Sequence, residues 1–141
     1  MVRKVSVDLE KYRKLGEKSY IKKLGRVVKL VGLTIESLGP DASLNDLCLI
    51  TSHENPNQQV HAEVVGFQDR KVLLMPYGNV EGIGPGAIVE NTGEPLKVPV
   101  GKEMLGQVLD GLGNKLDGEI ISASDYYSVE ADPPDPMARE I

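Results

Sequence analysis

The sequence predicts a mainly β protein, a small six-stranded closed β-barrel preceded by an amphipathic helix. Three observations support this fold class. Short clusters of Val, Leu and Ile recur between residues 25 and 98, turn-forming Gly, Pro, Asn and Asp groups separate them, and no helical period lies between them. With 141 residues and 40% apolar content, the chain can bury one core.

The first segment predicts a short amphipathic helix from about Ser6 to Leu15. Apolar residues stand at Val5, Leu9 and Tyr12, an i, i+4, i+7 stripe. Ser6 is a suitable N-cap, and the glycine at position 16 is suited to end the helix. A helix of this length is marginal alone in water, so it needs a surface to lie on, either its own domain or a partner.

The barrel strands are predicted from β-prone runs separated by turns. The first run, residues 25–39, carries Gly32 where a bulge or bend is expected. Five further strands are predicted at Leu47–Thr51, Val60–Phe67, Lys71–Met75, Ala87–Glu90 and Leu96–Val98. Strands this short favour closure into a barrel, because an open sheet of this size buries too little surface.

After Val98 the pattern changes. We expect a short helical turn at Lys102–Met104, a strand at Gln107–Leu109 and a tight glycine turn at Asp110–Asn114. The tail, residues 122–141, is rich in Pro, Ser and Asp without an apolar period, which predicts an extended connector. Apolar and charged residues return at the end of the chain, in residues 138–141. We expect this pattern of a truncated or processed protein.

Composition indicates a cytoplasmic protein. No run approaches the roughly 20 apolar residues of a membrane helix, and no apolar run follows the first basic residues as in a signal peptide. Cys48 has no cysteine partner and is expected to be a buried apolar residue.

Charge is distributed unevenly along the chain. Residues 1–30 hold ten Lys and Arg against three Asp and Glu, whereas residues 31–141 hold six against eighteen. The basic segment is compatible with an acidic protein surface, anionic lipid or nucleic acid, and equally with a solvated helix face.

Several motifs resemble ligand sites without meeting their patterns. The Gly82, Gly84 and Gly86 cluster lacks GxGxxG spacing and contains a proline, so a turn between barrel strands is expected. Gly101 and Lys102 look like the end of a P-loop, GxxxxGK[ST], but leucine stands at position 96, where that motif needs its first glycine. GxxxxGK[ST] occurs nowhere in the sequence. No catalytic residue, nucleotide-binding residue or cofactor is therefore predicted in this chain.

Metal sites are also disfavoured. Asp110, Asn114 and Asp117 break the calcium-loop pattern, and a glycine turn explains them better. His53 and His61 lack the spacing of a metal pair, so no metal ligand is predicted. A free-standing barrel that binds single-stranded nucleic acid is a further alternative, which the acidic barrel disfavours.

An ordered series of motifs resembles the opening third of the flagellum-specific export ATPase and its type III secretion relatives, which are in turn similar to the α and β subunits of rotary ATP synthase. The match covers roughly residues 25–141. Its motifs are GRVVKLVG, AEVVGF, LLMP, VEGIGPGA, VPVG, LGQVLDGLGNKLDG and PPDPMAR. The asparagine and lysine at positions 114 and 115 depart from the basic residue and proline that relatives often carry.

The resemblance implies three parts: a helical arm at residues 1–24, a β-barrel domain at 25–98, and at 99–141 the first strands of a truncated α/β nucleotide-binding domain lacking the P-loop. ATP and magnesium would bind only in the full-length protein, a homohexamer at the cytoplasmic face of the export apparatus, and this part alone would be inactive. The arm would dock on a stator protein that regulates the ATPase. The candidate contact residues are Val5, Leu9, Tyr12, Leu15, Lys11 and Lys14.

Two alternatives remain. The chain is compatible with part of a rotary ATP synthase or vacuolar-type subunit, in which the arm would be incidental, and its stripe is compatible with folding back on its own barrel. The sequence does not separate a flagellar from a virulence system, although its motifs look more flagellar.

Overall fold

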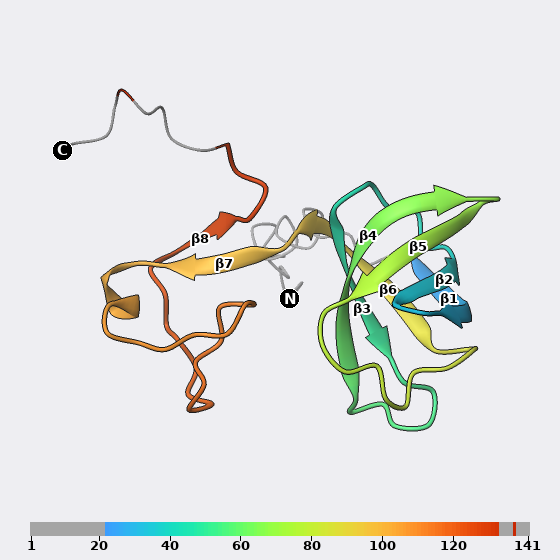
Figure 1. Cartoon of the computed structure of the whole chain (residues 1–141), viewed down its shortest axis with the longest axis horizontal. Coiled ribbons are helices and arrows are strands. Elements are labelled where there is room, and N and C mark those ends of the chain that lie inside the picture. Colours follow the sequence, from blue (N-terminus) through green and yellow to red (C-terminus); the bar gives the residue numbers. More distant parts are fainter. Residues whose placement is uncertain (1–21, 133–136, 138–141) are drawn as a thin grey trace, which may run out of the picture.

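Six antiparallel strands close into a barrel, as the sequence predicts. The structure is a computed structural model that describes residues 22–132 and 137, and Figure 1 shows the barrel beside a smaller two-stranded element. The barrel follows the order β1-β2-β5-β4-β3-β6. Its strands are β1 (Leu24–Val31), β2 (Thr34–Leu38), β3 (Asp46–Thr51), β4 (Gln59–Gln68), β5 (Lys71–Pro76) and β6 (Ile88–Pro95).

The barrel interior is a packed apolar core. Alternate residues along the strands point inward, and the largest fully buried ones include Ile35, Ile50, Val64 and Leu74. Cys48 lies among them, which confirms the expected apolar role, and burial together with the Asp46 charge raises the pKa of its thiol to about 11. No buried side-chain nitrogen or oxygen in the described residues lacks a hydrogen-bond partner. This interior therefore offers a ligand no polar group that is still unpaired.

The first β run is two strands, which corrects the expectation of a single bent one. β1 and β2 form a hairpin in which Val31 pairs with Thr34, so Gly32 and Leu33 are the two loop residues. Gly32 has a φ of 60°. A glycine with positive φ at the first position of a two-residue loop is typical of a type II′ hairpin turn.

The strand predicted at Leu96–Val98 is also corrected, because it does not belong to the barrel. β7 (Lys97–Val100) leaves the barrel and pairs antiparallel with β8 (Asp125–Ser128), with Val98 opposite Tyr127. The tail is therefore not a plain connector, since it supplies the partner strand. Six barrel strands remain because the first run contributes two.

The segment between β7 and β8 is partly as expected. The helical turn is confirmed as a short 3-10 helix, η1 (Lys102–Met104), and so is the glycine turn, in which the Asp110 amide donates to Asn114 O at 2.8 Å. The predicted strand at Gln107–Leu109 is wrong. Only an isolated β-bridge between Leu109 and Lys115 forms in this segment, because the glycine turn begins at the next residue, Asp110. Residues 97–132 are called the β7–β8 unit below.

Candidate functional site

The predicted contact residues of the arm, Val5, Leu9, Lys11, Tyr12, Lys14 and Leu15, lie outside the described residues, as does the predicted helix that carries them. The first described residues are two lysines at the entrance to the barrel. Lys22 Nζ lies 2.7 Å from Glu90 on β6, and Lys23 Nζ lies 3.1 Å from Asp41 after β2. These exposed pairs contribute little stability. They show that two of the basic residues of the first segment contact acidic groups of the barrel.

The outer face of the barrel carries one half-buried ion pair. Lys71 Nζ on β5 donates to Glu36 Oε2 on β2 at 2.8 Å. The hydrogen bond lowers the pKa of the Glu36 carboxyl and raises the pKa of the Lys71 ammonium. The pair lies across two neighbouring strands and stabilises their register, so we assign it a structural role.

The glycine-rich loop between β5 and β6 is a turn held to the rest of the barrel, as expected. Ser52 Oγ donates to Gly82 O at 2.8 Å, and the Gln58 side-chain amide donates to Glu81 O. Ile83 packs against the core. These hydrogen bonds and the packing of Ile83 hold the loop against the barrel, so we assign the loop a structural role.

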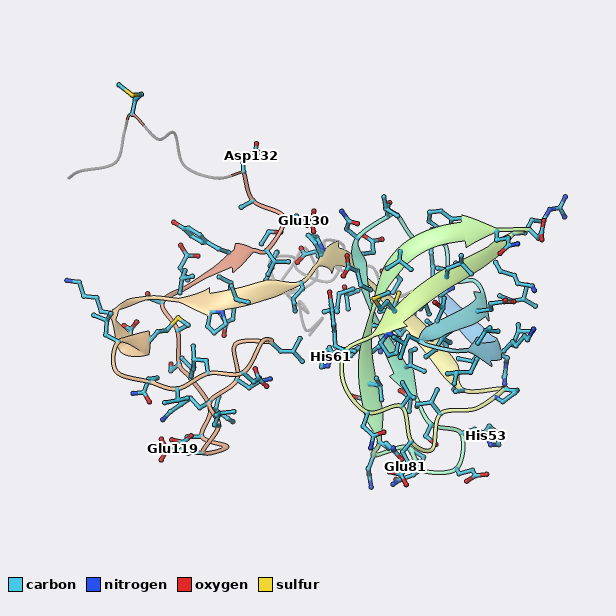
Figure 2. All side chains as sticks on the ribbon, viewed as in Figure 1. His53, His61, Glu81, Glu119, Glu130 and Asp132 are labelled. Carbon is cyan, nitrogen blue, oxygen red and sulfur yellow. The ribbon has the colours of Figure 1, made fainter. Side chains whose placement is uncertain are left out.

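The two histidines lie apart. Figure 2 shows His61 on β4 and His53 in the loop that follows β3, well separated. Within the part of the chain that the structure describes, no three His, Cys, Asp or Glu side chains come together in a way that would hold a metal.

The Asp110 carboxylate accepts hydrogen bonds from within the glycine turn that it begins. It accepts hydrogen bonds from Leu112 N at 2.9 Å, from Asn114 N at 2.8 Å and from Asn114 Nδ2 at 3.1 Å. The side-chain bond from Asn114, with the backbone bonds, lowers the pKa of Asp110. Gly113 has a φ of 82°, and a Cβ there would lie 2.6 Å from Pro99 Cδ, so the turn packs closely against β7. These contacts hold the Leu112 backbone in a fixed conformation.

The junction between the barrel and the β7–β8 unit is the feature that sequence reasoning missed. Tyr77 O–H donates to the Glu63 carboxylate on β4, and burial, followed by this bond, raises the pKa of Tyr77 to about 12. Glu130, labelled in Figure 2, accepts a hydrogen bond from Asn45 Nδ2 of the barrel at 3.0 Å. Asn45 and Glu130 are 85 residues apart in sequence, so no local pattern indicates that pair.

Cavities surround the tip of the glycine turn at this junction. One of about 350 Å³ is lined by Leu47, Leu96, Leu112 and Tyr126 among others, and one of about 340 Å³ by Tyr77, Leu96 and Leu112. They bring together side chains of the barrel and of the β7–β8 unit. Their lining is mainly apolar.

No helix among residues 22–132 and 137 has the length and apolar content needed to cross a membrane.

Comparison with known proteins places the barrel in a family. Residues 27–93 match the family model described as ATP synthase alpha/beta family, beta-barrel domain. The chain is 47% identical over 119 residues to a flagellum-specific ATP synthase of Bacillus subtilis, a match that covers 84% of the chain and 27% of that protein. It is 37% identical over 130 residues to a type 3 secretion system ATPase of Xanthomonas euvesicatoria, covering 92% of the chain and 29% of that protein.

A third relative is the flagellum-specific ATP synthase of Pseudomonas aeruginosa, 39% identical over 117 residues, which are 82% of the chain and 26% of that protein. The chain thus spans about a quarter of the length of the curated relatives it matches. The residues matched by the family model, 27–93, lie within the barrel, whose strands run from Leu24 to Pro95. Residues 27–93 are therefore a β-barrel domain of the ATP synthase alpha/beta family, and the relatives that match the chain are named flagellum-specific ATP synthase and type 3 secretion system ATPase.

Proposed function

We propose that this chain is the amino-terminal assembly and stator-binding module of an ATPase that energises flagellar or type III protein export. The observation that carries the proposal is the match itself. Relatives named flagellum-specific ATP synthase or type 3 secretion system ATPase align with 82% to 92% of the chain at 37% to 47% identity. The aligned stretch extends beyond the barrel model, which ends at residue 93.

The arm, residues 1–24, is the proposed stator-binding part. Its stripe of Val5, Leu9, Tyr12 and Leu15 is spaced to form one apolar helix face, and Lys11 and Lys14 add positive charge beside it. An amphipathic helix that lays such a face into a groove is a common mode of recognition, and the lysines would speed encounter with an acidic partner. The partner is therefore a stator protein with an apolar groove and an acidic rim.

The barrel, which ends at Pro95 and not at residue 98 as predicted, is the proposed ring-building part, and the segment from Lys97 to residue 141 is the proposed start of the ATPase domain. In a protein as long as its relatives, ATP and magnesium would bind outside residues 1–141, because GxxxxGK[ST] does not occur here. The whole protein would then act as a homohexamer at the cytoplasmic face of the export apparatus, coupling ATP hydrolysis to export. Residues 1–141 alone are expected to hydrolyse no ATP above the background of the buffer.

A rotary ATP synthase or vacuolar-type subunit is the second candidate. The family model is described by the ATP synthase alpha/beta name, which the rotary subunits share. In that case the chain would bind a peripheral-stalk subunit, and the arm would be dispensable.

A pull-down separates the two candidates. Residues 1–141 and a variant that lacks residues 1–20 are each mixed with the stator protein of an export apparatus and, in parallel, with a peripheral-stalk subunit. The proposal expects capture of the export stator by the complete chain and loss of capture without residues 1–20. Equal capture by both chains would overturn the assignment of the arm, and capture by the peripheral-stalk subunit alone would favour the rotary candidate.

A further inference from the structure

The barrel and the β7–β8 unit are joined by a narrow connection. β6 ends at Pro95 and β7 begins at Lys97, so within the described residues the chain passes from one to the other through Leu96. Figure 1 shows this single passage between the barrel and the two-stranded element. Rotation of a few backbone angles at Leu96 would therefore reorient the unit, unless other contacts hold it.

The tip of the glycine turn lies at this junction. Leu112 is half-buried and lines both cavities of the junction, together with Tyr77 and Leu47 of the barrel and Tyr126 of β8. The turn is held by the Asp110 hydrogen bonds and by the fit of Gly113 against Pro99. Leu112 is thus an apolar side chain on a turn of fixed conformation, and it lies between the barrel and the β7–β8 unit.

A polar contact lies just beyond the end of β8. Asn45 has a φ of 68°, a conformation that asparagine tolerates better than most residues, and its amide N–H donates to Val64 O at 2.9 Å. Its Nδ2 donates to Glu130 Oε2 at 3.0 Å. The backbone beyond β8 is also tied to the connection, because Val129 N donates to Leu96 O at 3.0 Å.

We infer that Leu112 and the Asn45–Glu130 hydrogen bond form a latch that fixes the orientation of the β7–β8 unit on the barrel, with Leu96 as its hinge. The two contacts lie on different segments, the glycine turn and the end of β8, so together they prevent rotation that either alone would allow. The cavities beside Leu112 mean that this junction is less tightly packed than the barrel core. Loss of the contacts would therefore release the unit while the barrel stays folded.

The orientation can be measured by pulsed electron paramagnetic resonance between two spin labels. Gln68→Cys on the barrel and Ser122→Cys on the unit are both at exposed positions, and the sole native cysteine, Cys48, is buried and escapes labelling. In this background we compare the unmodified junction with Leu112→Ala, Glu130→Ala and their combination. Leu116→Ala is the matched control, since Leu116 is 68% exposed on the same segment.

We expect a narrow distance distribution for the unmodified junction and for Leu116→Ala, and one about twice as wide for the combined variant. Glu130→Gln keeps an oxygen acceptor for Asn45 and is expected to stay narrow. Thermal unfolding of the barrel should not change in any of them. A combined variant as narrow as Leu116→Ala, or an unmodified junction already as wide as the combined variant, would overturn the latch. If Glu130→Gln widened the distribution as much as Glu130→Ala, the Asn45 hydrogen bond would be excluded from it.

Discussion

Gly25 on β1 faces Gly39 so closely that a Cβ at position 25 would lie 2.0 Å from the Gly39 carbonyl oxygen. Backbone thus packs against backbone where β1 enters the barrel. Ser37, fully buried on β2, lies at the same place, with its Oγ 3.1 Å from Arg26 O and 2.5 Å from Gly39 O. This close approach aligns the start of β1 for its pairing with both β2 and β6.

Gly25→Ala is therefore expected to destabilise the barrel by about 3 kcal/mol, because backbone cannot move aside as a flexible side chain can. Gly66→Ala is the matched control within the same barrel, since the nearest atom to a Cβ there is Leu73 Cδ1 at 3.8 Å. Urea unfolding measures both. A Gly25→Ala protein as stable as Gly66→Ala would show that the close approach does not exist.

The Tyr77–Glu63 hydrogen bond predicts a dependence of stability on high pH. Burial first, and then Glu63, raise the pKa of Tyr77 from 10.0 to about 12. The folded protein therefore holds this proton more tightly than the unfolded chain, so the contribution is complete below pH 10 and is lost as the pH rises toward about 12. Ultraviolet titration of phenolate should show that Tyr77 ionises late.

Tyr77→Phe should remove the late transition. Glu63→Gln should move it to lower pH without returning it to the ordinary value, because burial is the larger cause. A late transition that persists in Tyr77→Phe would assign it to another tyrosine and contradict the Tyr77–Glu63 contact.

Substitutions at Gly113 and Gly118 distinguish the cost of backbone strain from the cost of a steric clash in the β7–β8 unit. Both have positive φ, 82° and 79°, so alanine at either should cost about 1–2 kcal/mol from backbone strain. Only at position 113 does a Cβ meet another residue, Pro99 Cδ at 2.6 Å, which should add about 1–3 kcal/mol. Hydrogen exchange of the Asp110 amide, bonded to Asn114 O, reports the difference. Equal loss of protection in both variants would contradict the packing of the turn on β7.

Much of the barrel is predictable from the sequence, because its strands are local patterns of apolar alternation. Ile35, Ile50 and Leu74 are buried where that alternation places them. Gly32 carries an ambiguous signal, because a glycine followed by one residue between two β-prone runs fits a two-residue hairpin as well as a bulge or bend.

The β7–β8 pair was not predictable in the same way. Lys97 pairs with Ser128, a partner far along the chain, and nothing near either residue indicates the other. Tyr126 and Tyr127 give β8 its β propensity, but two aromatic residues in a polar tail are a weak signal. The junction escaped prediction for the same reason, since Asn45 and Glu130 meet only after both parts have folded. The stator contact residues remain a prediction from spacing.

The most direct test of the account is calorimetric titration of residues 1–141 with the stator protein of an export apparatus, using substitutions on the arm. Val5, Leu9 and Tyr12 form the proposed contact stripe. In the predicted helix, Val7 would lie on the opposite face, so it supplies a control of the same chemistry. We predict that the triple variant, in which Val5, Leu9 and Tyr12 are each changed to alanine, binds the stator protein at least about a hundred-fold more weakly, whereas Val7→Ala binds it about as tightly as the unmodified chain. Equal affinity of the triple variant and Val7→Ala would contradict it.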